Sequence, residues 1–160
     1  GSDFLDIGCN LGYATEAARR EGFNATGIEI DNDAVTTASI SFPQNDYVCT
    51  TAEAFAKTGR RFDLLYCSEV IEHVPDMHGF AAAMAKLAKP GGHVFITTPD
   101  AGHFLRPKHF ISWNEVKPPE HVCWYSKSTL QRLLEQHGFR IKKFWFTLKP
   151  GLKALAVKAS

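Results

Sequence analysis

Short apolar runs alternate with helical stretches along most of this chain. An apolar run bounded by turn residues is typical of a buried strand, and a longer stretch of helix formers that ends at glycine or proline is typical of a helix. The predicted strands are residues 4–7, 25–30, 47–49, 62–67, 93–98, 139–147 and 152–158. The predicted helices are residues 11–21, 33–41, 76–88 (capped by Asp76) and 129–137.

This alternation predicts a Rossmann-like, doubly wound α/β sheet with right-handed crossovers. The last two strands are joined by the short turn Lys149-Pro150-Gly151, so they must be antiparallel. We therefore predict one domain over residues 1–160 with a seven-stranded sheet in the order 3-2-1-4-5-7-6, in which strand 7 is antiparallel. Residues 89–92 are predicted to form the turn before the fifth strand.

Composition and charge narrow the class of protein. The chain is 44% hydrophobic and 22% charged with a net charge of +1, which is typical of a globular domain. A balance so close to neutral gives no general attraction to nucleic acid or anionic lipid, although a local basic patch stays compatible with it. Nucleic acid is therefore not the expected partner.

The chain carries no targeting or membrane signal of its own. It lacks the run of roughly 18 apolar residues that a membrane-spanning helix needs. No two of its four cysteines form a C-x-x-C pair, which is typical of reduced thiols in a cytoplasmic protein. Because a strand pattern starts almost directly after Gly1, we expect that N-terminal helices are absent.

The turn after the first strand carries the first chemical signal. It contains Asp6, Gly8 and Gly12, and Asn10 stands where the second glycine of a G-x-G-x-x-G dinucleotide motif would be. The Asp6 carboxylate would repel a pyrophosphate but would suit an ammonium or a sulfonium. S-adenosylmethionine carries both cations and no phosphate, so it is the cofactor that this turn favours.

A second acidic signal follows at the end of the second strand. Glu29 lies 21 positions beyond Gly8, where a carboxylate can accept hydrogen bonds from both ribose hydroxyls. Each signal alone is weak, but the two together in this strand order strongly favour a cofactor site.

Four segments carry a resemblance to a known family. They are D-I-G-C-N-L-G at 6–12, G-I-E-I-D at 27–31, F-D-L-L-Y-C-S-E-V-I-E-H-V-P-D at 62–76 and K-P-G-G at 89–92. Together they resemble the class I S-adenosylmethionine-dependent methyltransferases over nearly the whole chain. The segment 118–139 is similar to the branch that contains the ubiquinone-biosynthesis O-methyltransferases.

The resemblance implies a role for individual residues. Asp6, Gly8, Cys9 and Asn10 would surround the methionine part, and Cys67 and Ser68 would face its backbone. Glu29 would hold the ribose and Ile30 would pack on the adenine, whose edge Thr51, Ala52 and Glu53 would line. Two positions depart from the family: Thr51 stands where many relatives have aspartate, and Asn10 replaces a frequent glycine.

Histidines are the candidates for a general base, because the ordinary pKa of imidazole lies near 6.5. His73 follows the fourth strand, and His121 comes from the long irregular segment 100–126 on the same side. The alternative for His73, weighed equally, is that it bonds backbone at a tight turn. His103 and His109 are expected to be solvated.

Glu69, Glu72 and His73 form an E-x-x-E-H constellation. If helical, these positions share a face and suit Mg²⁺ or Mn²⁺, with His121 completing the set. The pattern is similar to one in metal-dependent small-RNA 2′-O-methyltransferases and some ubiquinone-pathway enzymes. The preferred interpretation is nevertheless that no metal binds, that Glu72 is solvated and that Glu69 braces the cofactor loop.

The leading hypothesis is a methyltransferase that acts on a small-molecule acceptor, with oxygen as the favoured acceptor atom. An RNA 2′-O-methyltransferase and an inactive cofactor-binding partner subunit are the alternatives. The segment 100–126 is too long and too aromatic for a simple connection. We expect it to cover the acceptor pocket, with Trp113, Trp124 and Tyr125 forming its apolar wall.

Overall fold

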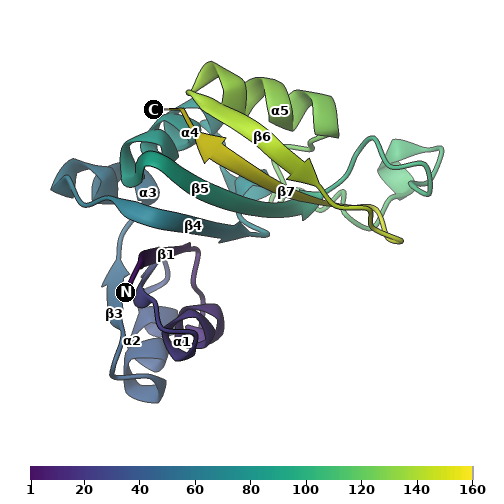
Figure 1. The fold of residues 1–160 in the computed structure, drawn as a ribbon. Coiled ribbons are helices and arrows are strands. Elements are labelled where there is room, and N and C mark those ends of the chain that lie inside the picture. The colour runs from purple at the N-terminus through teal and green to yellow at the C-terminus, as the bar shows by residue number, and fades with distance from the viewer. Residues whose placement is uncertain (160) are drawn as a thin grey trace.

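A seven-stranded sheet forms the middle layer of the molecule in the computed structural model, which describes residues 1–159 (Figure 1). The strand order is β3-β2-β1-β4-β5-β7-β6, as predicted from the sequence. The strands are β1 (Asp3–Ile7), β2 (Asn24–Glu29), β3 (Asp46–Cys49), β4 (Phe62–Ser68), β5 (Ala88–Pro99), β6 (Phe139–Phe144) and β7 (Gly151–Lys158).

The strand directions also follow the prediction. β1 lies between β2 and β4 and is parallel to both, while β7 is antiparallel to its neighbours β5 and β6. The chain therefore leaves β1 and β4 at the same edge of the sheet and turns to opposite faces. A crevice at that edge is where ligands bind in open α/β sheets.

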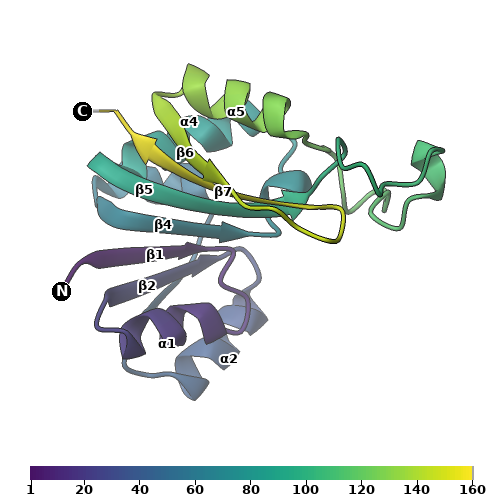
Figure 2. The same cartoon turned by 45° about the vertical axis from the view of Figure 1, so that its right-hand side comes forward.

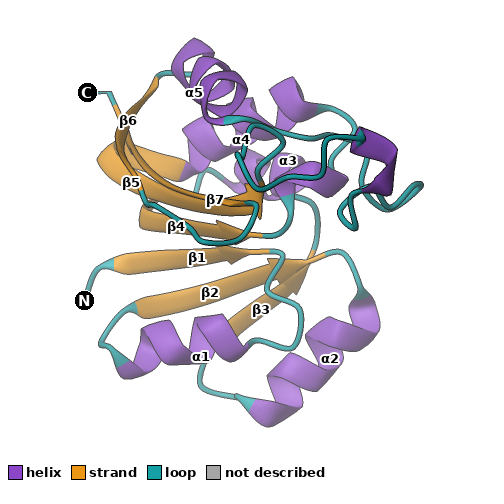
Figure 3. Ribbon diagram, turned by 90° about the vertical axis from the view of Figure 1, so that its right-hand side faces the viewer, coloured by secondary structure: helices purple, strands orange, loops and turns teal. Residues whose placement is uncertain are grey.

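Helices cover both faces of the sheet (Figure 3). α1 (Tyr13–Arg20) and α2 (Asn32–Ser41) lie on one face, and α3 (Ala52–Phe55), α4 (Met77–Leu87) and α5 (Lys127–Gln136) lie on the other. The N-caps Asp31 and Asp76 accept backbone N–H bonds as expected from the sequence, and Ser126 caps α5 in a capping box.

Several boundaries differ from the prediction for local reasons. Gly12 has a left-handed backbone with φ of 80°, so α1 begins only at Tyr13. Residues 89–92 form no separate turn but an irregularity within β5, since the register with β4 shifts after Phe62. α3 and three short 3-10 helices, η1 (Ala56–Thr58), η2 (Ile71–His73) and η3 (Phe110–Ser112), were not predicted.

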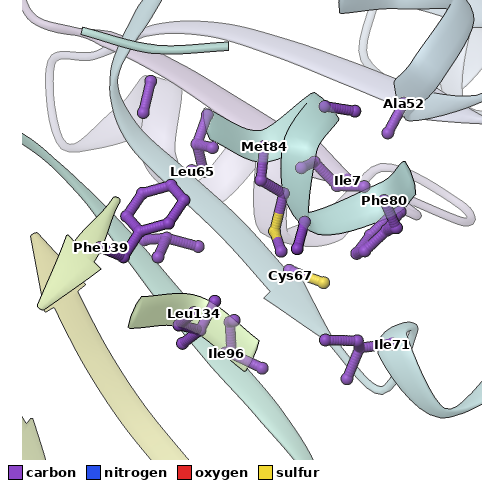
Figure 4. Close-up of a cluster of buried hydrophobic side chains, with 14 of the residues drawn as sticks. Ile7, Ala52, Leu65, Cys67, Ile71, Phe80, Met84, Ile96, Leu134 and Phe139 are labelled. Carbon is purple, nitrogen blue, oxygen red and sulfur yellow. The ribbon is translucent and has the colours of Figure 1, made fainter. Parts of the chain in front are cut away.

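The main core fills the space between the sheet and the helices α4 and α5 (Figure 4). Leu65, Met84 and Leu134 are fully buried there, on β4, α4 and α5 respectively. Burying each such side chain contributes roughly 1.5–3 kcal/mol. This packing fixes the end of β4, from which η2 and its histidine follow directly.

The segment 100–126 leaves β5 at the carboxyl edge of the parallel strands and projects away from the sheet (Figures 1 and 2). The β6–β7 hairpin turn extends from the same end of the molecule. Over residues 1–159, the helices are all too short or too polar to cross a bilayer.

Candidate functional site

A cavity of about 730 Å³ opens at the carboxyl ends of β1, β2 and β4. This is the edge at which the strand order reverses, and the volume falls in the usual range for ligand pockets. Four segments line it: the turn after β1, the end of β2, the start of α3 and the stretch from Ser68 to Phe80. The lining residues predicted from the sequence are Gly8, Asn10, Glu29, Ile30, Thr51, Ala52, Glu53, Ser68 and His73.

Glu29 joins the ends of β1 and β2. One of its carboxylate oxygens accepts the backbone N–H of Asn10 at 3.0 Å, and the other accepts those of Ile30 at 2.7 Å and Asp31 at 3.2 Å. Charge-assisted bonds of this kind hold the carboxylate rigidly. Asn10 is a non-glycine residue with a positive φ of 46°, and its bond to Glu29 supports that strained turn.

Gly8 allows the turn to pack closely under the cavity. Its φ is 76°, and a Cβ at this position would collide with the Val70 side chain. Glycine is therefore required both for the backbone conformation and for the contact with the segment after β4.

Asp6 lies beneath this turn rather than in the cavity lining. Its side chain is buried, and one carboxylate oxygen accepts a hydrogen bond from the Thr15 hydroxyl at 2.8 Å. Burial raises the pKa of Asp6 to about 6, against the hydrogen bonds from Thr15 that lower it. Asp6 is thus held just behind the turn, and its contact with the methionine part stays a prediction.

The two predicted cysteines also lie outside the lining. Cys67 is fully buried in the core beside Ile71, and burial raises the pKa of its thiol (Figure 4). Cys9 packs under the turn against Gly27, and burial raises its pKa to about 12. Alternation along the strand explains Cys67, because Ser68, the next residue, points to the opposite face and lines the cavity.

The opposite end of the cavity has an apolar wall suited to a flat ring. Ile30 is 73% exposed although it is aliphatic, and it lines the cavity together with Ala52. Thr51 Oγ1 accepts the backbone N–H of Ala54 at 3.2 Å and caps α3, so one of its lone pairs is already engaged within the protein. Glu53 and exposed backbone groups are left to bind the polar edge of such a ring.

A row of hydroxyls leads from Ser68 toward Glu69. Ser68 Oγ and Thr97 Oγ1 are 2.7 Å apart, and Thr97 Oγ1 donates to a Glu69 carboxylate oxygen at 2.7 Å. Glu69 has a positive φ of 55°, a conformation that costs a residue with a side chain of order 1 kcal/mol or more. Such strain at the edge of a cavity is typical of functional positions.

His73 and His121 lie edge to face, with ring centroids 4.7 Å apart. His73 Nδ1 lies 2.8 Å from the Glu120 carbonyl oxygen, and His121 Nδ1 lies 2.7 Å from that of Glu115. A carbonyl oxygen only accepts, so both Nδ1 atoms carry hydrogen and both Nε2 atoms have a free lone pair when the rings are neutral. Each ring can therefore accept a proton or bind a metal ion through Nε2.

Glu72 is buried, and the expectation that it is solvated is wrong. One carboxylate oxygen accepts the Thr98 hydroxyl at 2.9 Å, while Oε1 is buried without a hydrogen-bond partner among the described residues. Burial raises the pKa of this carboxyl. A buried oxygen without a hydrogen-bond partner is costly, so a bound group from outside the protein, such as water or a cation, would satisfy it.

The ligand atoms of Glu72, His73 and His121 all lie within 4.8 Å of one another, so the three residues fit a divalent cation. The carbonyl bonds to both Nδ1 atoms would orient the imidazoles toward it. Glu69 does not join this group on one helical face, because its positive φ breaks the helical turn and its carboxylate lines the cavity. The sequence pattern grouped Glu69 with the other three residues, whereas the structure brings together only those three.

The segment 100–126 does not line the cofactor cavity, and its role as a cover of the acceptor pocket stays a prediction. Among the residues that the structure describes, those that line the cavity all come from outside this segment. Trp113 is buried against Phe110, and Trp124 donates its indole N–H to the Glu115 carbonyl at 2.8 Å. These aromatics stabilise the segment itself, and its contribution to the site is His121.

Thr97 and Thr98 are the site residues that the sequence reasoning missed. They end β5 next to β4, and their hydroxyls bond Glu69 and Glu72 respectively. The signal was present in the strand order, since β5 was predicted to lie beside β4.

Comparison with known proteins agrees with this geometry. The family described as "Methyltransferase domain" matches residues 1–143. A ubiquinone biosynthesis O-methyltransferase of Klebsiella pneumoniae is 34% identical over 158 residues, which cover 86% of this chain and 64% of that protein. The one from Cronobacter sakazakii is 31% identical over 151 residues, which cover 75% of this chain and 62% of that protein. The chain thus spans less than two thirds of the length of the curated relatives it matches.

Solved structures share the fold at low sequence identity. An S-adenosylmethionine-dependent methyltransferase from Mesorhizobium loti superposes with a TM-score of 0.82 at 18% identity, covering 99% of this chain and 91% of that one. The magnesium protoporphyrin IX methyltransferase of Synechocystis, solved with bound cofactor, gives a TM-score of 0.73 at 17% identity, covering 99% and 71%. With its family match, sheet order and cavity, the chain belongs to the class I S-adenosylmethionine-dependent methyltransferases.

Proposed function

We propose that this chain transfers the methyl group of S-adenosylmethionine to an oxygen atom of a small-molecule acceptor. The observation that carries the proposal is the adjacency of the cavity and a histidine pair whose Nε2 atoms are free. The two curated relatives described above are both named ubiquinone biosynthesis O-methyltransferases, which supports oxygen as the acceptor atom.

Different residues of the cavity would bind different parts of the cofactor, according to their chemistry. Glu29 would hold the ribose hydroxyls, and Ile30 with Ala52 would pack on the adenine. Gly8, Asn10 and Ser68 would hold the methionine part. Asp6, buried behind the turn, would favour the positively charged sulfonium and ammonium groups through its carboxylate. When bound, the cofactor supplies an electrophilic methyl group and a sulfur leaving group.

His73 is the better candidate for the base, because it lines the cavity while His121 is buried behind it. Its Nε2 would take the proton from the acceptor hydroxyl as the oxygen forms its bond to the methyl carbon. The bond between sulfur and the methyl carbon would break at the same time, and its electron pair would stay on the sulfur leaving group. The protein mainly has to hold the acceptor oxygen about 3 Å from the methyl carbon, in line with the breaking bond.

A metal-assisted variant of the same reaction is the second candidate, favoured by the orphaned Oε1 of Glu72. Glu72, His73 and His121 would hold a divalent cation, which would lower the pKa of an acceptor hydroxyl. The acceptor hydroxyl would then release its proton to water, because both Nε2 atoms would be engaged by the cation.

Transfer assays with labelled cofactor would test the proposal, using a panel of phenolic and aliphatic hydroxyl compounds with short RNA as a competitor class. The expected result is labelled product from a small hydroxyl compound. Labelling of RNA alone would replace the proposal by the 2′-O-methyltransferase alternative. Tight binding of S-adenosylhomocysteine without any transfer would instead support an inactive partner subunit.

The four free cysteines fit the cytoplasmic setting that the sequence favours.

A further inference from the structure

Two histidines outside the candidate functional site lie against each other on the side of the sheet that carries α4 and α5. His78, in the first turn of α4, and His137, the C-cap of α5, are 59 positions apart in sequence, yet His78 Nδ1 and His137 Nε2 are 3.1 Å apart. The ring centroids are 5.4 Å apart, with 48° between the ring planes. We call these two residues the helix histidine pair. His78 is exposed and His137 is half-buried, so ions in solution can reach the pair.

The fold holds the backbones of both histidines in place. α4 and α5 cover the same face of the sheet (Figure 3), and Met84 of α4 and Leu134 of α5 belong to one buried core. The His137 N–H donates to the Leu134 carbonyl oxygen at 3.1 Å, and the carbonyl oxygen of the next residue, Gly138, accepts the N–H of Ala159 at 2.8 Å. The two imidazoles are therefore brought together by packed helices, which position a site more precisely than loops do.

The separation of the two facing nitrogens suits either a hydrogen bond or a shared metal ion. Between neutral imidazoles, one ring donates a hydrogen bond to the other. Two imidazoles that bind the same Zn²⁺ ion have Zn–N bonds of about 2.0–2.1 Å, so nitrogens 3.1 Å apart would meet the ion at an angle of roughly 100°. This angle lies between the right angle of octahedral coordination and the wider tetrahedral angle, both of which imidazole-bound ions adopt.

The outer nitrogen of each ring makes a change from hydrogen bond to metal binding possible. Among the described residues, the hydrogen bond of the pair engages only the two facing nitrogens, and His78 Nε2 and His137 Nδ1 have no partner in the protein. The ring that donates can therefore move its hydrogen to the outer nitrogen without losing a bond to the protein. Both facing nitrogens then carry a lone pair that can bind a metal ion.

We propose that the helix histidine pair binds a Zn²⁺ ion and links α4 to α5 through it. Imidazole nitrogen suits zinc and the neighbouring transition metals, whereas Mg²⁺ and Ca²⁺ prefer oxygen ligands. Water would fill the coordination positions that the two histidines leave open. Because Asp76, the N-cap of α4, lines the cofactor cavity, the ion would also hold the start of that helix at the cavity wall.

Calorimetric titration with Zn²⁺ tests the proposal. Since Glu72, His73 and His121 also fit a divalent cation, the titration uses a background in which His73→Gln and His121→Gln remove that second cluster. We expect this background to bind a single Zn²⁺ ion per chain. Adding His137→Gln or His78→Gln is expected to weaken the binding about a hundredfold, because the second imidazole no longer acts at a high effective concentration.

The matched control adds His109→Gln to the same background, which removes an exposed histidine of the segment 100–126 instead. It should bind Zn²⁺ as the background does, and circular dichroism without metal checks that every variant is folded. Zn²⁺ should raise the unfolding temperature of the background and the control but not of the two pair variants, because an ion that binds only the folded chain stabilises it.

Two results would overturn the proposal. One is a background that binds no Zn²⁺, and the other is equal Zn²⁺ affinity in the pair variants and the His109 control. The titration needs neither cofactor nor methyl transfer, so its outcome is independent of the proposed function.

Discussion

The buried Glu72 bonds both to the sheet and to the segment that carries the second histidine. Its carboxylate accepts the Thr98 hydroxyl of β5, and its backbone carbonyl accepts the N–H groups of Val122 at 2.9 Å and Cys123 at 3.1 Å. The segment 100–126 is thus attached to η2 at Glu72, the residue before His73, whose ring contacts that of His121.

Substituting His73 by glutamine is expected to lower kcat by about 10²–10⁴-fold, because a general base is lost. Affinity for S-adenosylhomocysteine should change little, since the ribose and adenine contacts lie elsewhere in the cavity. Single-turnover kinetics and calorimetry measure the two effects. His109→Gln, on an exposed histidine of the same segment, is the control and should keep full activity.

Activity in the presence of a chelator distinguishes the mechanism with His73 as the base from the metal-assisted mechanism. With His73 as a base, activity of the unaltered chain persists in excess chelator. If activity disappears in chelator and returns with Mg²⁺ or Mn²⁺, Glu72, His73 and His121 hold a metal and the base assignment is wrong.

Glu29→Gln is expected to weaken binding of S-adenosylhomocysteine by about 1–3 kcal/mol, because charged hydrogen bonds to ribose become neutral ones. Part of the effect comes through the protein, since Glu29 also holds the strained turn at Asn10. Calorimetry measures the change, with Glu21→Gln on the exposed end of α1 as the control. Unchanged affinity in a folded Glu29 variant would exclude the ribose role.

The raised pKa of Asp6 predicts a pH-dependent stability. The carboxyl loses its proton near pH 3.8 in the unfolded chain but near pH 6 in the folded one, so the folded state binds more protons between these values. Its contribution to the free energy of unfolding is therefore full below pH 3.8 and falls by up to about 3 kcal/mol as the pH rises to 6.

Asp6→Asn tests this sign directly. The variant should be more stable than the unaltered chain at pH 8 and similar to it near pH 4, as measured by urea unfolding. It should also bind the cationic S-adenosylmethionine more weakly, because the compensating carboxylate is gone. A variant that is less stable at pH 8 would show that the bond from Thr15 outweighs the cost of burying the charge.

Trp113→Ala is expected to act on stability rather than on acceptor binding. Trp113 is buried against Phe110 within the segment 100–126 and lies outside the cavity lining, so its loss leaves a cavity in that cluster at a cost of about 3–5 kcal/mol. Thermal unfolding or proteolysis of the segment measures the effect, while affinity for S-adenosylhomocysteine should stay within twofold, roughly, of the unaltered value. A raised KM with unchanged stability would restore the acceptor role that the sequence suggested.

The sequence predicted the sheet well because its signals are local and repeated. Each apolar run, such as the one from Phe62 to Cys67, is bounded by turn residues, and the strand order follows from the crossovers. The cofactor turn was located by Asp6, Gly8 and Glu29 for the same reason, although the burial of Asp6 depends on packing that no local pattern contains.

Other features of the site depend on contacts between distant segments. The burial of Glu72 requires Thr98 and the backbone of Val122, neither of which lies near it in sequence. The position of Trp113 depends on whether an aromatic segment packs on itself or on a ligand, and its composition is the same in both cases. Glu69 was assigned to a helical face because spacing alone cannot reveal its positive φ.

The two histidines come from different parts of the fold. His73 follows β4 and is held by the core, whereas His121 belongs to a segment that projects from the sheet and is attached near its end. Lifting that segment would withdraw one imidazole and leave the other in place. Acceptor and product would then exchange while the pair is apart, and proton removal would be restricted to the closed arrangement, away from bulk water.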